Sequence, residues 1–213
     1  MSVVEPERAG VGLLARVRDI LFRPGRTWDA IEAETPSAGE LLKTYAAPLA
    51  AIPAVCRAIG DVAFRGGLFG VQYRPTFLVT VLQMLADFGL AFVRVTVLAL
   101  AIYLLAPAFG GRRSLGQALK LSVYSATAAW IAGFALLQPT VGFLIVLLAW
   151  VYGLYLMFLG LPKLMKVQGE RTLTYFAAIL VVAVVMGVAL ETMNKRLREM
   201  GGPVAVILPH VGR

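Results

Sequence analysis

Residues 121–162 read LSVYSATAAWIAGFALLQPTVGFLIVLLAWVYGLYLMFLGLP, a run of 42 positions without a charged side chain. A transmembrane helix needs about 20 apolar residues to cross a hydrocarbon core of about 30 Å. The run is therefore long enough for two crossings, and Gln138-Pro139-Thr140 lies at its midpoint, where we predict the turn. We expect spans over residues 115–137 and 141–161, which together form a helical hairpin.

Three further apolar segments flank this hairpin, over residues 41–59, 77–105 and 173–190. The segment 77–105 is longer than a crossing requires, so we expect it to tilt or protrude. Pro48 and Pro53 remove helical hydrogen bonds from the first segment, which favours a kinked helix covered by its neighbours. The predicted fold class is an all-α integral membrane protein, a five-transmembrane-helix bundle.

The composition excludes several classes of protein. Of the 213 residues 59% are hydrophobic and 15% are charged, and the mean hydropathy is +0.79. Soluble domains carry about 25% charged residues, and a soluble fold of this length cannot bury so much apolar surface. A disulfide scaffold is excluded because Cys56 is the only cysteine. The net charge of +8 comes from cations between apolar segments, where they anchor spans, so we expect no nucleic-acid partner.

Residues 12–23 have the pattern of an amphipathic helix. Arg16, Arg18, Asp19 and Arg23 lie opposite or beside an apolar face with helical spacing. A basic helix next to membrane spans is typical of the bilayer interface, where anionic headgroups attract it. Packing against the end of the bundle is the alternative. The apolar residues are Leu13, Leu14, Val17, Ile20 and Leu21.

A second short helix is predicted after Pro24-Gly25, which end the first one. Thr27 is placed to cap it, and it carries Trp28 and Ile31. Tryptophan and tyrosine gather at membrane interfaces. We therefore expect an interfacial position for Trp28, Trp150, Tyr152 and Tyr155.

The chain is predicted to have three regions and two sides. They are a cytoplasmic N-terminal segment with the amphipathic helix at 1–40, a five-span membrane domain at 41–190, and a C-terminal tail at 191–213. Residues 60–74 are predicted to form a loop. Segments on the N-terminal side carry more Lys and Arg than those on the other side, which favours a cytoplasmic N-terminus and a C-terminus on the opposite side.

Gln83, Asp87 and Arg94 form the candidate polar site within the spans. Separations of four and seven residues place the three side chains within roughly 40° of one direction on a helix. An ionisable residue inside a membrane is costly and is a functional hypothesis by default. Seven residues rise about 10.5 Å, so water or another helix must mediate between Asp87 and Arg94. Two interpretations stay open, a polar path or regulated contact and a purely structural pairing.

No pattern of catalytic or metal-binding residues is present. The only histidine is His210, and the sequence contains no cluster of metal ligands, no phosphate-binding loop and no nucleophile motif. We therefore expect a non-enzymatic protein without a cofactor or metal. Small residues at helical spacing predict close helix packing. They are Ser125, Ala129 and Gly133 in the third span and Ala183 and Gly187 in the fifth.

Short motifs follow one another in a characteristic order over residues 20–190. They are Leu21-Phe22-Arg23-Pro24, Tyr45-Ala46-Ala47-Pro48-Leu49, Leu105-Ala106-Pro107-Ala108-Phe109-Gly110-Gly111, Tyr124-Ser125-Ala126-Thr127 and the run from Tyr152 through Gly160-Leu161-Pro162-Lys163. This order resembles the Ypt-interacting protein (Yip) family in its bacterial branch. Ala128 departs from it, because proline is common there, and this puts the kink that such a proline imposes in doubt. The positions that carry the resemblance are Pro48, Pro107, Gly110, Gly111, Tyr124, Ser125, Tyr152, Gly160, Pro162 and Lys163.

The resemblance implies a five-helix membrane domain with a cytoplasmic N-terminus, in agreement with the charge distribution. Eukaryotic members are linked to small GTPases and vesicle traffic, machinery that bacteria lack. What carries over is a non-enzymatic, membrane-embedded interaction or bilayer-organising module in a bacterial inner membrane. Its expected partners are the lipid bilayer, anionic headgroups near the N-terminal helix, and a membrane protein or a second copy of the chain.

Two other functions stay open. The protein is a small-solute or ion transporter or channel component that uses Gln83, Asp87 and Arg94, or it is an accessory subunit of a larger membrane complex. A water-filled cavity that reaches Asp87 and Arg94 would favour transport. A dry, packed interior would leave the interaction module.

Overall fold

The computed structural model describes residues 12–63 and 77–201, and these two ranges contain helices and no strand. In these ranges the α-helices are joined by the π-helical segment η1 and the 3₁₀ segments η3 and η4. In chain order they are α1 (Leu13–Phe22), α2 (Pro24–Ala33), α3 (Ala38–Glu40), η1 (Leu41–Ala46), α4 (Ala47–Ala63), α5 (Phe77–Leu105), η3 (Ala106–Phe109), α6 (Leu115–Ser125), α7 (Thr127–Ala132), η4 (Gly133–Leu137), α8 (Pro139–Met165) and α9 (Gly169–Gly201).

Within the described ranges, five helical segments are long and apolar enough to cross a membrane, which confirms the five predicted spans. The second and third spans begin at the predicted residues. The helices α8 and α9 extend beyond the predicted segments at both ends, and α9 continues through Glu191. The spans are Ala38–Ala63, Phe77–Phe109, Leu115–Leu137, Val141–Met165 and Gly169–Met193.

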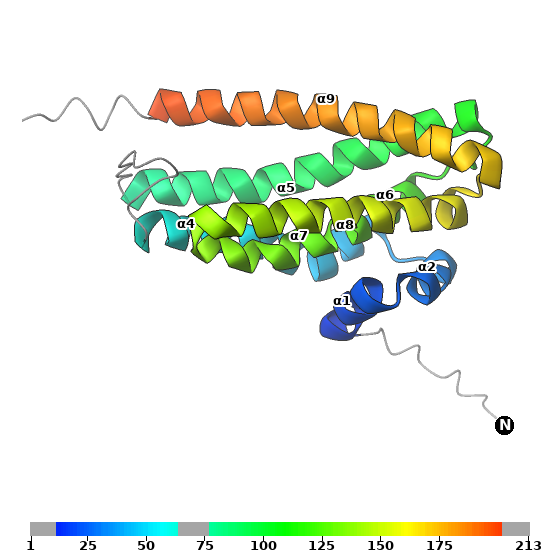
Figure 1. Cartoon of the computed structure of the whole chain (residues 1–213), viewed down its shortest axis with the longest axis horizontal. Coiled ribbons are helices and arrows are strands. Elements are labelled where there is room, and N and C mark those ends of the chain that lie inside the picture. The colour runs from blue at the N-terminus through cyan, green and yellow to red at the C-terminus, as the bar shows by residue number, and fades with distance from the viewer. Residues whose placement is uncertain (1–11, 64–76, 202–213) are drawn as a thin grey trace, which may run out of the picture.

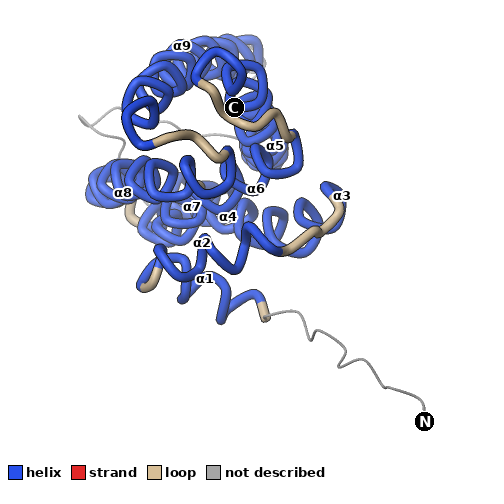
Figure 2. The backbone as a smooth tube through the Cα atoms, turned by 90° about the vertical axis from the view of Figure 1, so that its right-hand side faces the viewer, coloured by secondary structure: helices blue, strands red, loops and turns tan. Residues whose placement is uncertain are grey.

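The helices lie in three layers (Figure 1, Figure 2). The helices α5 and α9 form the first layer, and α4, α7 and α8 form the second. The short helices α1 and α2 lie against the second layer on the side away from α9. We call the end of the bundle where α8 stops at Met165 the near end, and the end where α5 begins at Phe77 the far end. The helix α9 runs from the near end to the far end.

The near end is closed by a tight turn after η3. Gly110 adopts a left-handed backbone with φ +73°, a conformation that glycine accepts without strain. The Arg112 amide then donates to the Met165 carbonyl over 2.6 Å and joins the end of the second span to the end of the fourth. Beneath it, the Tyr175 hydroxyl donates to the Ile102 carbonyl. The near ends of the spans are thereby fastened to one another.

The third span is a broken helix. The helix α6 ends at Ser125 and α7 begins at Thr127, although no proline occupies position 128. The Thr127 hydroxyl instead shares a 2.9 Å hydrogen bond with the Tyr45 hydroxyl from the first span. The break therefore exists without the family proline.

The first span begins with a widened turn. Its π-helical segment ends two residues before Pro48, and Pro53 lies inside α4. A wide turn relieves the clash between a prolyl ring and the preceding turn of the helix. The helix also continues past Ile59, so Gly60 is helical and the predicted loop start at residue 60 is wrong. Gly60 lies directly against the Leu136 carbonyl, a close approach that excludes a side chain. Residues 64–74 of that predicted loop lie outside the described residues.

The N-terminal helix is present as predicted, over Leu13–Phe22. The predicted role of Thr27 is wrong. Pro24 takes the first position of α2, where its missing N–H costs nothing. Thr27 lies one turn inside the helix, and its hydroxyl donates to the Arg23 carbonyl over 2.9 Å. The start of α2 is therefore set by the proline and not by a threonine cap.

Candidate functional site

The three predicted polar residues of the second span lie on one side of α5, and the two charged ones pair with different helices. The Gln83 amide donates to Asp87 over 3.2 Å. Arg57 of α4 lies 3.9 Å from Asp87, between Nε and Oδ2. The Arg94 guanidinium donates to Glu191 of α9 over 3.3 Å. Asp87 and Arg94 therefore each have an oppositely charged neighbour on another helix, and a link between the two side chains stays a prediction.

Arg57, Asp87, Arg94 and Glu191 line one cavity of about 240 Å³ between the first and second layers. The third span contributes Ser125, which is 6% exposed and whose hydroxyl has no hydrogen-bond partner within the described ranges. A buried hydroxyl without a partner is costly. The interior around Asp87 and Arg94 thus contains a cavity and, in its wall, a buried hydroxyl without a hydrogen-bond partner among the described residues.

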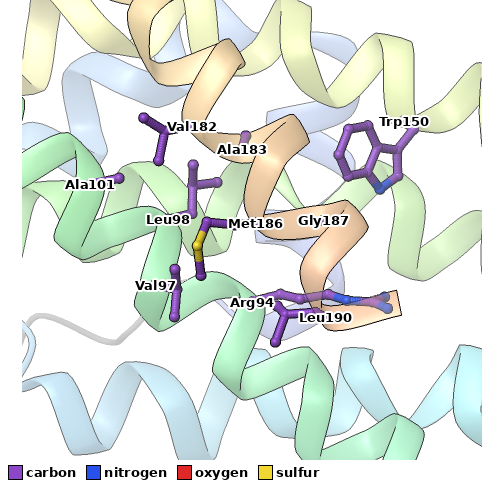
Figure 3. Close-up of a pocket in the computed structure, with 10 residues that line it drawn as sticks. All are labelled: Arg94, Val97, Leu98, Ala101, Trp150, Val182, Ala183, Met186, Gly187 and Leu190. Carbon is purple, nitrogen blue, oxygen red and sulfur yellow. The ribbon is translucent and has the colours of Figure 1, made fainter. Parts of the chain in front are cut away.

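A second cavity of about 260 Å³ continues from Arg94 between α5 and α9 (Figure 3). Arg94, Leu98, Trp150 and Ala183 line both cavities. Apart from Arg94, the walls of the second cavity are formed by apolar side chains, small residues and Trp150. They are Val97, Leu98, Ala101, Trp150, Val182, Ala183, Met186, Gly187 and Leu190.

The two predicted small-residue faces have different roles. Gly133 packs directly against Pro53, where an added Cβ would lie 2.7 Å from the Pro53 Cβ, so close packing is confirmed there. An added Cβ at Gly187 would meet nothing within 4 Å, so the predicted close packing at that position is wrong. Gly187 and Ala183 keep the second cavity open instead.

The predicted interfacial position of Trp28 is also wrong, because this indole is fully buried. It meets the Tyr124 ring edge to face, with centroids 6.2 Å apart and planes at 89°. Gly160 provides the space for it, since an added Cβ there would lie 2.7 Å from the indole. Trp150 and Tyr155 are half exposed on α8, and their place at an interface stays a prediction.

Polar contacts fasten α2 to the near end of the bundle. The buried Lys120 ammonium donates to the carbonyls of Ile31, over 2.6 Å, and Glu34, over 2.8 Å, and so caps the carboxyl end of α2. Lys163 donates to the Gly25 carbonyl and to Asp29, each over 2.6 Å. We call α1 and α2, fastened in this way, the platform. Further polar contacts hold the platform: the Tyr152 hydroxyl donates to the Leu21 carbonyl, the Gln117 amide donates to the Glu32 carbonyl over 3.2 Å, and Lys166 forms an ion pair with Glu32.

Arg16 departs from its predicted place on the polar face of the first helix. Its side chain is buried beneath α1, and its guanidinium forms an ion pair with Glu34, which follows α2. Burying a charge is favourable only with a partner and further hydrogen bonds. The pair also links α1 to the residue that follows α2. The carbonyl of the same Glu34 accepts a hydrogen bond from Lys120 of the membrane domain.

Most of the positions that carry the family resemblance lie toward the near end of the bundle. Tyr124, Tyr152, Gly160 and Lys163 contact the platform directly. Gly110 and Gly111 form the turn after η3, the segment in which Pro107 takes the second position. Pro162 lies inside α8 beside Lys163, Pro48 is exposed on α4, and Ser125 lines the first cavity.

The sequence pattern does not identify Arg57 and Glu191 as partners in the candidate site, because each lies at the edge of a predicted span, where a charged residue normally marks the boundary. The signal that could have found them is charge balance. A span holding both Asp87 and Arg94 needs one cation and one anion from its neighbours. Lys120 was missed for the same reason, since it immediately precedes the uncharged run.

The Yip1 domain family model matches residues 18–190 of this chain. The inner membrane protein YohC of Escherichia coli strain K12 is 24% identical over 177 residues, which cover 81% of this chain and 90% of that protein. YohC of Escherichia coli O6:H1 is similar to the same extent. No solved structure matches the chain significantly. With its five apolar spans in the described ranges, the chain is an integral membrane protein, and it belongs to the Yip1-domain family.

Proposed function

We propose that this protein is a non-enzymatic interaction module of the bacterial inner membrane, and that the platform is its contact surface for anionic headgroups. The observation that supports the proposal is the two-sided character of the platform. Its inner side is fastened by Trp28 and Lys120, whereas Leu14 and Phe22 are 82% and 79% exposed on its outer side. The name of the YohC relatives supports the choice of membrane.

Exposed cations accompany these apolar side chains. Arg18, Arg23 and Arg26 are all exposed on the platform. Apolar side chains that enter the interface and arginines that meet anionic lipids act together, and each cation near the surface contributes about 1 kcal/mol. Because the platform is attached to the spans, binding of headgroups there gathers anionic lipids beside the bundle. This is the bilayer-organising role that we propose.

A reporter on the platform tests this role. Cys56→Ala removes the native thiol, and Leu14→Cys then carries an environment-sensitive dye. In reconstituted vesicles we expect a blue-shifted emission when part of the phosphatidylcholine is replaced by phosphatidylglycerol. The triple variant Arg18→Gln, Arg23→Gln, Arg26→Gln should lose that shift.

The matched control removes three exposed near-end cations outside the platform, Lys43, Arg112 and Arg113, each changed to Gln. It should keep the shift. Equal emission in both kinds of vesicle for the parent protein would refute the platform as a headgroup contact.

A second candidate function, movement of a small solute, is favoured by one observation. Asp87 and Arg94 line a cavity, and transport requires that this cavity is filled with water. Asp87→Asn in liposomes loaded with a solute-sensitive dye tests it, because loss of the carboxylate should reduce flux. Equal flux in the variant and the parent protein, or flux no higher than in empty liposomes, removes this candidate.

A further inference from the structure

The arginines of the first cavity have more N–H donors than the described residues of the chain satisfy. A guanidinium carries five N–H donors. Arg57 makes no hydrogen bond to any residue of 12–63 or 77–201, and Arg94 makes a single one, to Glu191. Both lie in membrane-spanning segments, where polar groups without partners are costly. A phosphate group, which accepts several hydrogen bonds from arginine, matches this surplus of donors.

Asp87 and Glu191 line the same cavity, so its formal charges cancel. A purely anionic ligand would meet two carboxylates as well as two guanidiniums and gain little from the cavity as a whole. A ligand that carries both a phosphate and an ammonium pairs with each kind of side chain. The buried Ser125 hydroxyl, which has no hydrogen-bond partner among the described residues, adds a polar group to the lining of the same cavity and calls for a hydrogen-bonding occupant.

The lining of the second cavity has the chemistry to hold a hydrocarbon chain, because it is apolar apart from Arg94. Figure 3 shows Arg94 next to Leu190, with Met186, Ala183 and Val182 following along α9. From Leu190 to Val182 the helix falls by about 12 Å toward the near end. One leaflet of a hydrocarbon core is about 15 Å deep. The cavity therefore extends from the charged side chains along most of one leaflet.

We propose that the two cavities together bind one phospholipid with a zwitterionic, primary-amine headgroup, a phosphatidylethanolamine. Its phosphate lies at Arg57 and Arg94, its ammonium at Asp87 and Glu191, and one acyl chain between α5 and α9. This site is independent of the platform, which lies against the other side of the second layer, and so it goes beyond the proposed function.

Trp150 reports occupancy, because it lines both cavities. The delipidated full-length protein in a nonionic detergent is titrated with phosphatidylethanolamine brominated on its acyl chains, which quenches nearby indoles. We expect saturable quenching at a low lipid mole fraction, and a large decrease of this quenching in Trp150→Phe, because Trp130 lines only the first cavity. Brominated phosphatidylcholine, whose ammonium has no N–H donor, and brominated phosphatidylglycerol, which has no cation, should each require about tenfold more lipid.

Gly187→Leu places a side chain in the second cavity, where an added Cβ meets nothing within 4 Å, and replaces glycine by a good helix former, so the variant should fold. We expect it to raise the half-quenching concentration about tenfold. Val185→Leu, on an exposed face of the same helix, is the matched control and should leave it unchanged. Arg57→Gln should remove the preference for phosphatidylethanolamine while some quenching by the chain remains.

The other results overturn the proposal in distinguishable ways. Equal quenching by all three lipids shows an unspecific apolar surface. Stronger quenching by phosphatidylglycerol shows an anion site, and unchanged quenching in Gly187→Leu shows that the chain lies elsewhere. None of these results bears on the dye shift measured on the platform.

Discussion

The ring of Trp28 stands edge-on to the ring of Tyr124, although 96 positions separate the two residues in the chain, and Gly160 of a third segment leaves the space in which they meet. Neither aromatic ring faces outward, since Trp28 is fully buried and Tyr124 is 5% exposed. This contact is the centre of the joint between the platform and the membrane domain. A side chain at position 160 would therefore disturb the joint directly.

Gly160→Ala should loosen this joint. The added Cβ would lie 2.7 Å from both the Trp28 indole and the Leu121 side chain, and such overpacking costs about 1–3 kcal/mol. The free energy of unfolding in detergent and the protease sensitivity of residues 12–34 measure the effect. Gly89→Ala is the control, because it lies in the middle of α5 with nothing within 4 Å of the added methyl group. It should be neutral or slightly stabilising, and equal behaviour of the two variants would contradict the role given to Gly160.

Lys120→Met should release the carboxyl end of α2. The buried ammonium donates to carbonyls of Ile31 and Glu34, and hydrogen bonds from a charged donor are worth about 1.5–3 kcal/mol. We expect faster amide hydrogen exchange in residues 24–34 with little change in α5 or α9. Lys43→Met removes an exposed lysine at the same end of the bundle and should leave the exchange of α2 as it is. Uniform acceleration throughout the bundle would indicate a global loss of stability instead.

Neutralising the glutamate should destabilise the protein more in the Arg16–Glu34 pair than in the Arg94–Glu191 pair. The Arg16 side chain is 9% exposed, so Glu34→Gln leaves a buried guanidinium unpaired and should cost about 3 kcal/mol of unfolding free energy. The side chains of Arg94 and Glu191 are about half exposed, so Glu191→Gln should cost less than about 1 kcal/mol. Denaturation of both variants in the same detergent measures the difference. The reverse order would show that α9 depends on its ion pair more than the platform does.

Cysteine labelling tests the orientation predicted from the lysine and arginine distribution. In a Cys56→Ala background, Thr35→Cys lies before the first span and Lys195→Cys lies on the last turns of α9, and both residues are exposed. We expect a membrane-impermeant thiol reagent to modify the cysteine at 195 in intact cells, and the one at 35 only after lysis. Labelling of both positions from the same side would contradict an odd number of crossings.

The hydropathy pattern alone determined the number of spans and the approximate place of each in the chain. Residues 77–105 were predicted as one helix, and the structure has the same helix, because twenty or more consecutive apolar residues have few alternatives to a membrane helix. The same local periodicity placed Gln83, Asp87 and Arg94 on one face of it. A helical repeat defines which residues share a face, and this requires no knowledge of the neighbouring helices.

Only the tertiary structure decided what these faces meet. Arg57 and Glu191 lie 30 and 97 positions from the α5 residues with which they pair, and Trp28 lies 132 positions from Gly160. Lipid-facing and helix-facing surfaces are both apolar, so hydropathy does not distinguish them. The sequence therefore gives the same expectation for Gly133, which packs against Pro53, and for Gly187, which borders open space. Which helices become neighbours depends on shape complementarity and on the pairing of a few charges. These properties belong to pairs of segments and exist only once the chain has folded.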